Sequence, residues 1–324
     1  MPMHSSTVDR LHVVAAVITD RAGRVLLAKR PQHLHQGGLW EFPGGKREAG
    51  EEISHTLVRE LYEELGITPT QFRPMIGVKH NYPDRKVFLD VWRVSAFKGT
   101  PHGAEGQELR WVEAENLPEF SFPAANRPIV TAAMLPDSYL ITPDPGGAER
   151  WPQFLAQLEA TLEGNIGLVQ FRAKGLNTAE LMELSPHVVQ CCHDHGCRVM
   201  LNGEPELART LGYDGVHLGS ARMNACHSRP LPGDYLVAAS CHNAAELHKA
   251  ATFGCDFVVL GPVCATATHP EASEMGWVRF AQLVERCALP VYALGGMGRD
   301  DYDRAWRHGA QGIAAIRALW KGEV

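Results

Sequence analysis

Cysteine is absent from the first 190 residues, and the eight cysteines that follow form no C-x-x-C pair. A disulfide framework is therefore not predicted, and free thiols in a reducing cytosol are expected. The run Cys191–His195 (CCHDH) holds ligand-type side chains. Adjacent cysteines suit tetrahedral zinc poorly, so we interpret this run as the end of a helix before Gly196, with a zinc site as the alternative.

Long apolar runs are also lacking, since none approaches the roughly 20 residues of a membrane span. The apolar stretch between Arg10 and Asp20 is short and predicts a first strand rather than a signal peptide. We therefore expect a cytoplasmic protein without a membrane partner.

A surplus of basic residues is missing as well: 31 Lys and Arg stand against 37 Asp and Glu, a net charge of −6. This charge argues against broad binding of polymeric nucleic acid. It still permits a single nucleotide held through metal ions.

The length of 324 residues predicts two domains. The composition changes near residue 135, where acidic residues clustered on one helical pattern give way to short apolar runs. Pro136 resists helix continuation at this point. We expect one domain over residues 1–135 and a second over residues 136–324.

The second half contains eight strand-like runs, most of them continuously apolar, as expected of parallel strands covered on both faces. Helical patterns separate most of them, for example residues 149–164 and 243–254. The α/β pattern predicts a compact (β/α)8 TIM barrel, with an open doubly wound sheet as the competing arrangement. The runs are YLIT from Tyr139, IGLVQFR from Ile166, RVMLN from Arg198, DGVHLG from Asp214, YLVAAS from Tyr235, DFVVLG from Asp256, LPVYAL from Leu289 and GIAAIR from Gly312.

A helical pattern that begins at Glu51 carries the strongest functional signal. Glu60, Glu63 and Glu64 share one face of it, beside an apolar face. Carboxylates this close repel one another, and hard divalent cations relieve the repulsion. A solvated acidic face is the alternative. The apolar face comprises Leu57, Val58, Leu61 and Leu65, and Gly66 is suited to ending the helix.

The same segment matches the pattern G-x5-E-x7-R-E-U-x-E-E-x-G-U, in which U is aliphatic, at every defined position. This pattern is the Nudix box, so the first half resembles the Nudix hydrolases. The resemblance implies an α/β/α sandwich and hydrolysis of a nucleoside triphosphate or similar diphosphate compound with Mg²⁺, or with Mn²⁺ in its place. The matching residues are Gly45, Glu51, Arg59, Glu60, Leu61, Glu63, Glu64, Gly66 and Ile67.

Residues 11–130 resemble the MutT type of this family, which hydrolyses 8-oxo-dGTP, sanitises the nucleotide pool and so prevents mutation in replicated DNA. In that type an asparagine hydrogen-bonds the oxidised guanine, and it maps onto Asn126. An amide can read a purine edge with one donor and one acceptor. The alternative is that Asn126 starts a turn near Pro128. The matching segments are WEFPGGK (Trp40–Lys46), YPDR (Tyr82–Arg85), EGQ (Glu105–Gln107) and FPAANRP (Phe122–Pro128).

The resemblance implies that water attacks the substituted phosphorus and releases a nucleoside monophosphate and pyrophosphate. Glu63 and Glu64 would bind metal, and Glu60 would be a metal ligand or the water activator; the pattern leaves open which glutamate is the base. The Gly44 carbonyl and the Glu105 carboxylate would complete the metal shell, and Arg59 would brace the carboxylates. The implied substrate contacts are Asn126, Phe42 and Tyr82, with Arg30 and Arg85 either on phosphate or base or simply at the surface.

Residues 137–320 resemble the thiamine phosphate synthase and thiazole tautomerase superfamily, a phosphate-binding barrel. The segments QFRAK (Gln170–Lys174), GVHLGS, SCH, GPVCATATHP and ALGGM each follow the expected strand. The resemblance implies a phosphorylated small molecule as ligand. His242 suits a tautomerase-like proton transfer, or else a structural hydrogen bond. The implied ligand site is Gln170, Arg172, Lys174, Asn202, His242, Gly295 and Gly296.

The barrel departs from the synthase pattern where acidic magnesium ligands are expected. Gly203 follows Asn202 in place of an aspartate, and Ser220, Ala221 and Arg222 stand where another aspartate is expected. His269 replaces an expected lysine. The loss of both acids argues against magnesium-diphosphate chemistry in the barrel.

Three functions therefore compete. The first is an oxidised-purine nucleotide diphosphatase with a barrel appended, which Asn126 and its flanking segments favour. The second is a Nudix hydrolase of a thiamine-related diphosphate, which the fusion favours. In the third, the barrel is a non-catalytic ligand-binding module, which the lost acids favour.

Overall fold

The computed structural model describes residues 10–33, 36–164, 166–266 and 273–322. Residue contacts divide the chain into two compact units, Met1–Met134 and Leu135–Val324. Within the described residues, no helix is both long and apolar enough to cross a membrane.

The first unit is built on a four-stranded sheet in the order β4-β1-β6-β5. Strand β1 runs parallel to β6 and antiparallel to β4, while β5 and β6 form a long antiparallel hairpin. A second sheet has the order β3-β2-β7. The strands are β1 Leu11–Ile18, β2 Val25–Lys29, β3 Trp40–Glu41, β4 Gly44–Lys46, β5 Thr68–Asn81, β6 Lys86–Lys98 and β7 Leu109–Val112.

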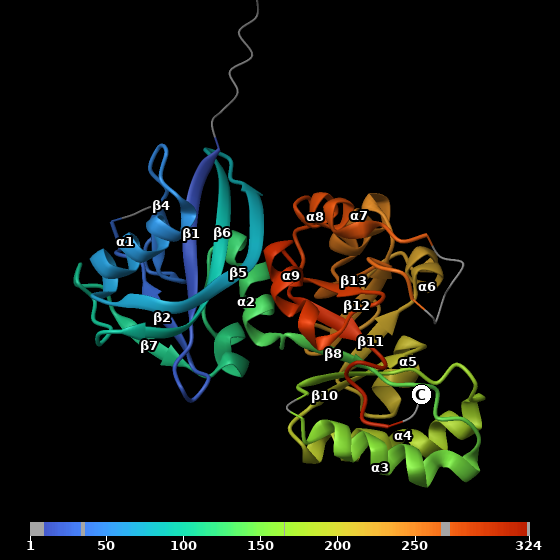
Figure 1. Cartoon of the computed structure of the whole chain (residues 1–324). Helices are drawn as coiled ribbons and strands as arrows, with labels where there is room; N and C mark the ends of the chain where they lie inside the picture. The colour runs from blue at the N-terminus through green and yellow to red at the C-terminus, as the bar shows by residue number, and fades with distance from the viewer. Residues whose placement is uncertain (1–9, 34–35, 165, 267–272, 323–324) are drawn as a thin grey trace, which may run out of the picture. The chain divides into compact units, whose positions relative to one another are not determined.

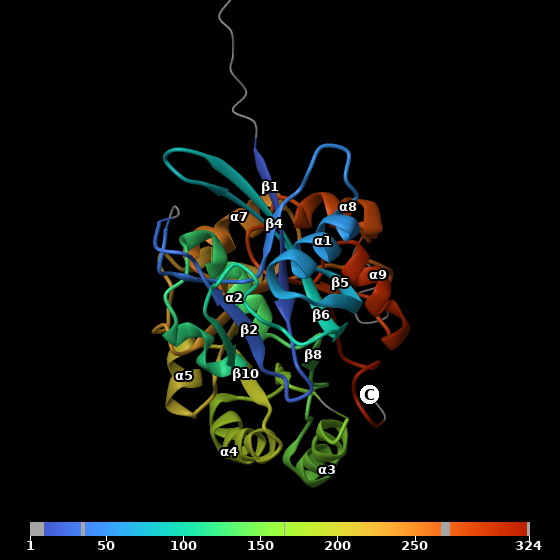
Figure 2. The same cartoon turned by 90° about the vertical axis from the view of Figure 1, so that its left-hand side faces the viewer.

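Alternation along β1 explains why helices cover both faces of this sheet. Val14, Ala16 and Ile18 pack against α1 (Ile53–Leu65), whereas Ala15 and Val17 pack on the side of α2 (Arg127–Met134). Figure 1 shows the strands between the two helices, and Figure 2 views the sheet from the α1 side. The predicted α/β/α sandwich is confirmed. Two 3₁₀ helices, η1 (Ala114–Glu119) and η2 (Ala124–Asn126), precede α2.

Helix α1 starts two residues later than the pattern predicted. Its N-cap is Glu52, and Glu51 lies outside the helix, where its carboxylate pairs with Arg59. The C-terminal end agrees with the prediction: Gly66 adopts φ 66° and donates its N–H to the carbonyls of Leu61 and Tyr62. Glycine accepts this left-handed conformation without steric cost.

The second unit is a closed barrel of eight parallel strands, and every predicted run forms one of them. The open-sheet alternative is wrong, because β8 pairs with both β9 and β15. The strands are β8 Ser138–Ile141, β9 Leu168–Phe171, β10 Arg198–Asn202, β11 Gly215–Leu218, β12 Leu236–Cys241, β13 Phe257–Leu260, β14 Val291–Leu294 and β15 Gly312–Ala315.

Helices surround these strands, as Figure 1 shows. The strands are apolar on both faces because one face fills the barrel and the other packs beneath the helices. In β8, for example, Tyr139 lies in the inner cluster with Phe257 and Tyr292, while Leu140 joins the outer cluster. The helices are α3 Trp151–Leu162, α4 Thr178–Asp194, α5 Pro205–Thr210, α6 Ser220–Ala225, α7 Ala244–Phe253, α8 Gly276–Val284 and α9 Tyr302–Arg307, with 3₁₀ turns η3 Ala148–Arg150 and η4 Arg299–Asp301.

The cysteine-rich run lies at the end of α4, as interpreted from the sequence. Cys191 and Cys192 belong to the helix, His195 is its C-cap, and His193 pairs with Asp214 at 3.0 Å. All eight cysteines are free thiols.

Candidate functional site

Burial of one face of α1 leaves its glutamates on the adjacent face. Leu57, Leu61 and Leu65 are 0–1% exposed against the sheet. Glu60 is half-buried and the side chain of Glu63 is 57% exposed. The predicted cluster of carboxylates is therefore held on a rigid element, with one member open to solvent.

Arg59 ties this cluster together. Its guanidinium donates to both carboxylate oxygens of Glu51 at 3.0 Å, to Glu60 at 2.8 Å and to Glu63 at 3.2 Å. It also donates to the carbonyl of Lys46 at 3.1 Å. One cation thus braces three carboxylates and links α1 to the glycine loop before it.

Glu64 lies in the most desolvated position of the cluster. Burial raises its pKa to about 8, and the charges of Glu41, Glu60 and Glu105 act in the same direction. The backbone N–H of Gly44, which donates to Glu64 at 3.0 Å, opposes the rise. Burial likewise raises the pKa of Glu60. A cation bound among these groups would stabilise the charged form of each carboxylate, which burial disfavours.

Glu41 is a site residue that the sequence did not reveal. It lies on β3, its pKa is raised by burial, and its charge acts on Glu64. Arg30 forms an ion pair with its carboxylate. The structure thus places the guanidinium of Arg30 beside Glu41.

The loop that carries Glu105 is fastened to the end of α1. The side chain of Gln107 donates to the carbonyl of Glu64 at 3.0 Å, and the N–H of Ala104 donates to the same carbonyl at 3.0 Å. The amide oxygen of Gln107 accepts the N–H of Glu105 at 2.9 Å. These bonds explain why the charge of Glu105, 41 positions along the chain from Glu64, acts on that buried carboxyl.

Gly45 has a steric reason to be glycine. A Cβ at this position would lie 2.0 Å from Oε2 and 2.3 Å from Cδ of Glu60. The backbone of the loop therefore lies too close to the Glu60 carboxylate to leave room for a Cβ. Any side chain here would displace it.

The donor set of this cluster fits a hard divalent cation, because it offers carboxylate and carbonyl oxygens that repel one another without one. As they stand, Arg59 holds Glu60 and Glu63, and Gly44 holds Glu64. Within the described residues, no three Asp, Glu, His or Cys groups converge into a ready cage. Metal binding would therefore exchange these hydrogen bonds for metal–oxygen bonds.

Apart from Arg30, which lies beside Glu41, the expected substrate residues fall into two places. Phe42 is buried and stacks on Phe122 with ring centroids 5.5 Å apart, which joins the glycine loop to the segment before α2. Asn126 ends η2 and is 8% exposed; its backbone N–H donates to Pro123, and its side-chain amide has no hydrogen bond to any described residue.

The other place is the turn of the β5–β6 hairpin. The N–H of Tyr82 donates to the carbonyl of Arg85 at 2.8 Å, and the ring of Tyr82 meets that of His80. The guanidinium of Arg85 is exposed and pairs with Asp84 at 2.9 Å. The structure thus places Arg85 on the exposed turn of the hairpin, beside Asp84.

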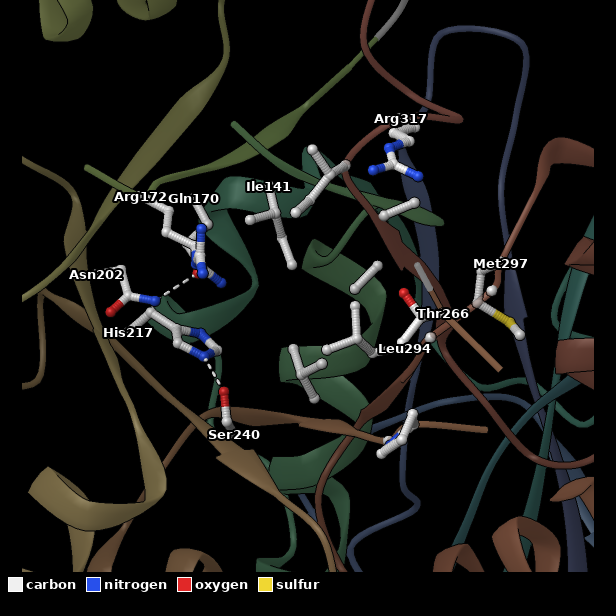
Figure 3. A pocket seen from close by; sticks show the side chains of 18 of the residues that line it. Ile141, Gln170, Arg172, Asn202, His217, Ser240, Thr266, Leu294, Met297 and Arg317 are labelled. Atoms are coloured by element: carbon white, nitrogen blue, oxygen red, sulfur yellow. Dashed lines mark hydrogen bonds between the residues drawn. The ribbon is translucent and has the colours of Figure 1, made fainter. Parts of the chain in front are cut away.

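A cavity of about 590 Å³ opens at the carboxyl ends of the barrel strands (Figure 3). All seven residues expected for the barrel site line it: Gln170, Arg172, Lys174, Asn202, His242, Gly295 and Gly296. Ile141, Val259 and Leu294 add apolar wall. A cavity of this size and composition is typical of small-molecule sites.

Polar side chains along one side of the cavity form two hydrogen-bonded groups, and Figure 3 draws the Asn202–Gln170 and His217–Ser240 bonds. Asn202 donates to the amide oxygen of Gln170 at 2.7 Å, while the Gln170 amide nitrogen is buried without a partner. His217 connects Tyr139 at 3.2 Å with Ser240 at 2.8 Å. Sequence reasoning missed this second group.

His217 is buried, and burial lowers its pKa to about 3, so the ring is neutral. A neutral imidazole donates through one nitrogen and accepts through the other. It therefore fixes the orientation of the Ser240 hydroxyl at the cavity wall. His242 lies nearer the surface, where its Nδ1 is 2.7 Å from the carbonyl of Gly261 and its N–H donates to Glu246.

The departures from the synthase pattern are visible in space. Arg222, on α6, pairs with Glu204 at 2.6 Å beside Gly203. His269 lies outside the described residues. Arg317, which the sequence did not single out, also lines the cavity.

Two family models match the chain: one described as NUDIX domain over residues 14–132, and one described as thiamine monophosphate synthase over residues 138–319. The 8-oxo-dGTP diphosphatase of Escherichia coli (strain K12) is 36% identical over 121 residues, which are 37% of this chain and 94% of that protein. The CTP pyrophosphohydrolase of the same organism is 40% identical over 124 residues, 38% of this chain and 91% of that protein.

The thiamine-phosphate synthase of Synechococcus sp. (strain WH7803) is 34% identical over 187 residues, 57% of this chain and 52% of that protein. The chain thus spans about half the length of that relative. Both resemblances inferred from the sequence are confirmed by these matches.

Proposed function

Since the chain belongs to the NUDIX family over residues 14–132 and to the thiamine monophosphate synthase family over residues 138–319, we propose that its first unit hydrolyses a nucleoside triphosphate to the monophosphate and pyrophosphate. The observation that carries this proposal is the carboxylate cluster of α1, braced by Arg59 and closed by the loop of Glu105. Mg²⁺ is the cation that suits it, with Mn²⁺ as the substitute.

Glu60, Glu63, Glu64 and Glu105 would hold the metal, together with the carbonyl of Gly44. A Mg²⁺ ion held there would supply neutralisation of phosphate charge and a lowered pKa of bound water. The chain contributes the rest: Arg59 fixes the carboxylates, and Gly45 lets the loop approach them. Glu60 would serve either as a further metal ligand or as the group that takes a proton from the attacking water.

Within this class, we assign 8-oxo-dGTP as the substrate. Asn126 supports it, because a nearly buried amide without a partner in the described residues is free to read a base. The similarity to the E. coli 8-oxo-dGTP diphosphatase supports it as well. The E. coli CTP pyrophosphohydrolase, which is 40% identical against 36% for the 8-oxo-dGTP diphosphatase, makes CTP the competing substrate, and the fused barrel adds thiamine diphosphate.

The test is pyrophosphate or phosphate release with Mg²⁺ from 8-oxo-dGTP, dGTP, CTP and thiamine diphosphate. We expect kcat/KM to be highest for 8-oxo-dGTP. Asn126→Ala should reduce the preference for 8-oxo-dGTP over dGTP about ten- to a hundredfold, the worth of a base-specific hydrogen-bond pair. An unchanged ratio in the mutant would make Asn126 a turn residue and remove the substrate assignment.

For the barrel, we propose a ligand-binding module for a phosphorylated small molecule that does not make thiamine phosphate. The support is Gly203 and the Arg222–Glu204 pair at the positions where acidic metal ligands are expected. The full chain should fail to restore growth of a thiamine-phosphate-synthase-deficient strain. Restored growth that survives Glu63→Gln would refute this part.

A further inference from the structure

The charged side chains that line the barrel cavity carry one sign. Arg172 and Lys174 follow β9, and Arg317 follows β15, on the two sides of β8. Figure 3 shows Arg172 and Arg317 on either side of Ile141. In the described part of the chain, no carboxylate forms an ion pair with any of the three, and none lines the cavity.

A divalent cation does not fit this lining. The acid nearest the family's metal position, Glu204, is engaged by the Arg222 guanidinium at 2.6 Å. Three further cations at the mouth would repel Mg²⁺, and the remaining polar wall consists of amides, hydroxyls and histidines rather than hard anionic oxygens.

The cavity is nevertheless built for a ligand. The amide nitrogen of Gln170 is buried without a partner, and Gln170 is only 2% exposed. An unmet donor in such a position is costly unless an acceptor on a ligand satisfies it. Ile141, Val259 and Leu294 make part of the wall apolar, so the cavity suits a ligand that combines an apolar body with an acceptor atom.

We infer that the barrel binds a phosphate or diphosphate ester without any divalent cation, and that Arg317, with Arg172 and Lys174, takes the place of the metal. This inference rests on the proposed role of the barrel as a ligand-binding module. The loops after β14 and β15, which carry Gly295, Gly296 and Arg317, lie where barrels commonly bind phosphate. Guanidinium groups are suited to this because they donate in pairs to phosphate oxygens.

The experiment measures binding of pyrophosphate to the full chain by calorimetry, once in EDTA and once in Mg²⁺. In EDTA the acidic cluster of α1 repels pyrophosphate, so the signal reports the barrel. We expect binding in EDTA that weakens with added salt and is not strengthened by Mg²⁺ at the barrel. Arg317→Gln should weaken it about tenfold or more, the worth of a charge-assisted hydrogen bond.

Arg286→Gln is the matched control, because it removes the same charge from an exposed position before β14, at the opposite end of the strands. It should leave the affinity within about twofold. Equal weakening by both variants would overturn the inference, since a general charge effect would then explain the binding. Binding that requires Mg²⁺, is lost in Arg172→Gln and is kept in Glu63→Gln would also overturn the inference of metal-free binding. That result would still leave the barrel a ligand-binding module. No binding in either condition would refute the module itself and the inference with it.

Discussion

Gly45→Ala separates the geometry of the carboxylate cluster from the stability of the fold. The new Cβ would lie 2.0 Å from Glu60 Oε2, whereas ordinary contact begins at 3.4 Å, so the carboxylate must retreat by about 1.4 Å. This shift removes Glu60 from its place beside Arg59. A misplacement of about 1 Å in a catalytic group lowers activity about 100-fold, which is the loss expected here in kcat/KM.

The Gly45→Ala change should have little effect on the stability of the fold. The φ of Gly45 lies outside the left-handed region, and the clashing atoms are the end of a flexible side chain. Loss of the partly exposed Arg59–Glu60 pair costs up to about 1 kcal/mol, and the stiffer unfolded chain returns about 0.4–1 kcal/mol. We therefore expect a Tm within a few degrees of wild type.

The assay is Mg²⁺-dependent pyrophosphate release, with a melting curve for each variant. Gly23→Ala is the control: φ is +84°, no atom lies within 4 Å of its Cβ, and the left-handed strain costs roughly 1–2 kcal/mol. It should lower Tm and leave kcat/KM unchanged. If Gly45→Ala keeps activity within a few-fold of wild type, the close approach to Glu60 has no catalytic role; if Gly23→Ala loses as much activity, the loss reflects folding.

Three further predictions concern charge and domain structure. In EDTA, the free energy of unfolding should fall as pH rises from about 4.3, the ordinary pKa of a glutamate, to about 8, because the folded pKa of Glu64 is raised. Glu64→Gln should remove this cost, which is roughly 1.4 kcal/mol per pKa unit. Parallel profiles of Tm against pH for the wild type and Glu64→Gln would instead show that the carboxyl is solvated. Glu63→Gln should leave Tm unchanged, because the side chain is 57% exposed. It should nevertheless reduce pyrophosphate release at saturating Mg²⁺ about 100-fold or more, and near-normal turnover would exclude Glu63 as a metal ligand. Residues 1–134 alone should fold and hydrolyse the same substrates as the full chain, because all members of the carboxylate cluster lie within them; a folded but inactive fragment would mean that the barrel contributes to catalysis.

Local patterns in the sequence predicted what they could determine. The barrel strands were found because both of their faces are buried, so that runs such as FVVL in β13 are apolar without interruption. The spacing of Glu60, Glu63 and Glu64 placed them on one helix face regardless of tertiary structure. The helix starts two residues after the predicted position, because periodicity does not locate an N-cap: Glu51 fits the pattern but lies before the N-cap residue Glu52 and pairs with Arg59.

Groups assembled from distant strands left no such pattern. Tyr139, His217 and Ser240 come from β8, β11 and β12, and only barrel closure brings them into one hydrogen-bonded chain. Glu41 was missed because a single carboxylate on a two-residue strand has no periodicity; its role appears only where its charge reaches Glu64.

The pairing of β8 with both β9 and β15 has a consequence for the order in which the protein forms during synthesis. The first barrel strand leaves the ribosome about as soon as the preceding unit is complete, but one of its two partners, β15, is the last strand of the barrel. The first unit can thus acquire its structure while the barrel is still being translated. Until Gly312–Ala315 emerges, β8 presents an open edge, and contacts of such long sequence separation form slowly. We expect chains truncated just before β15 to be the ones most prone to aggregate.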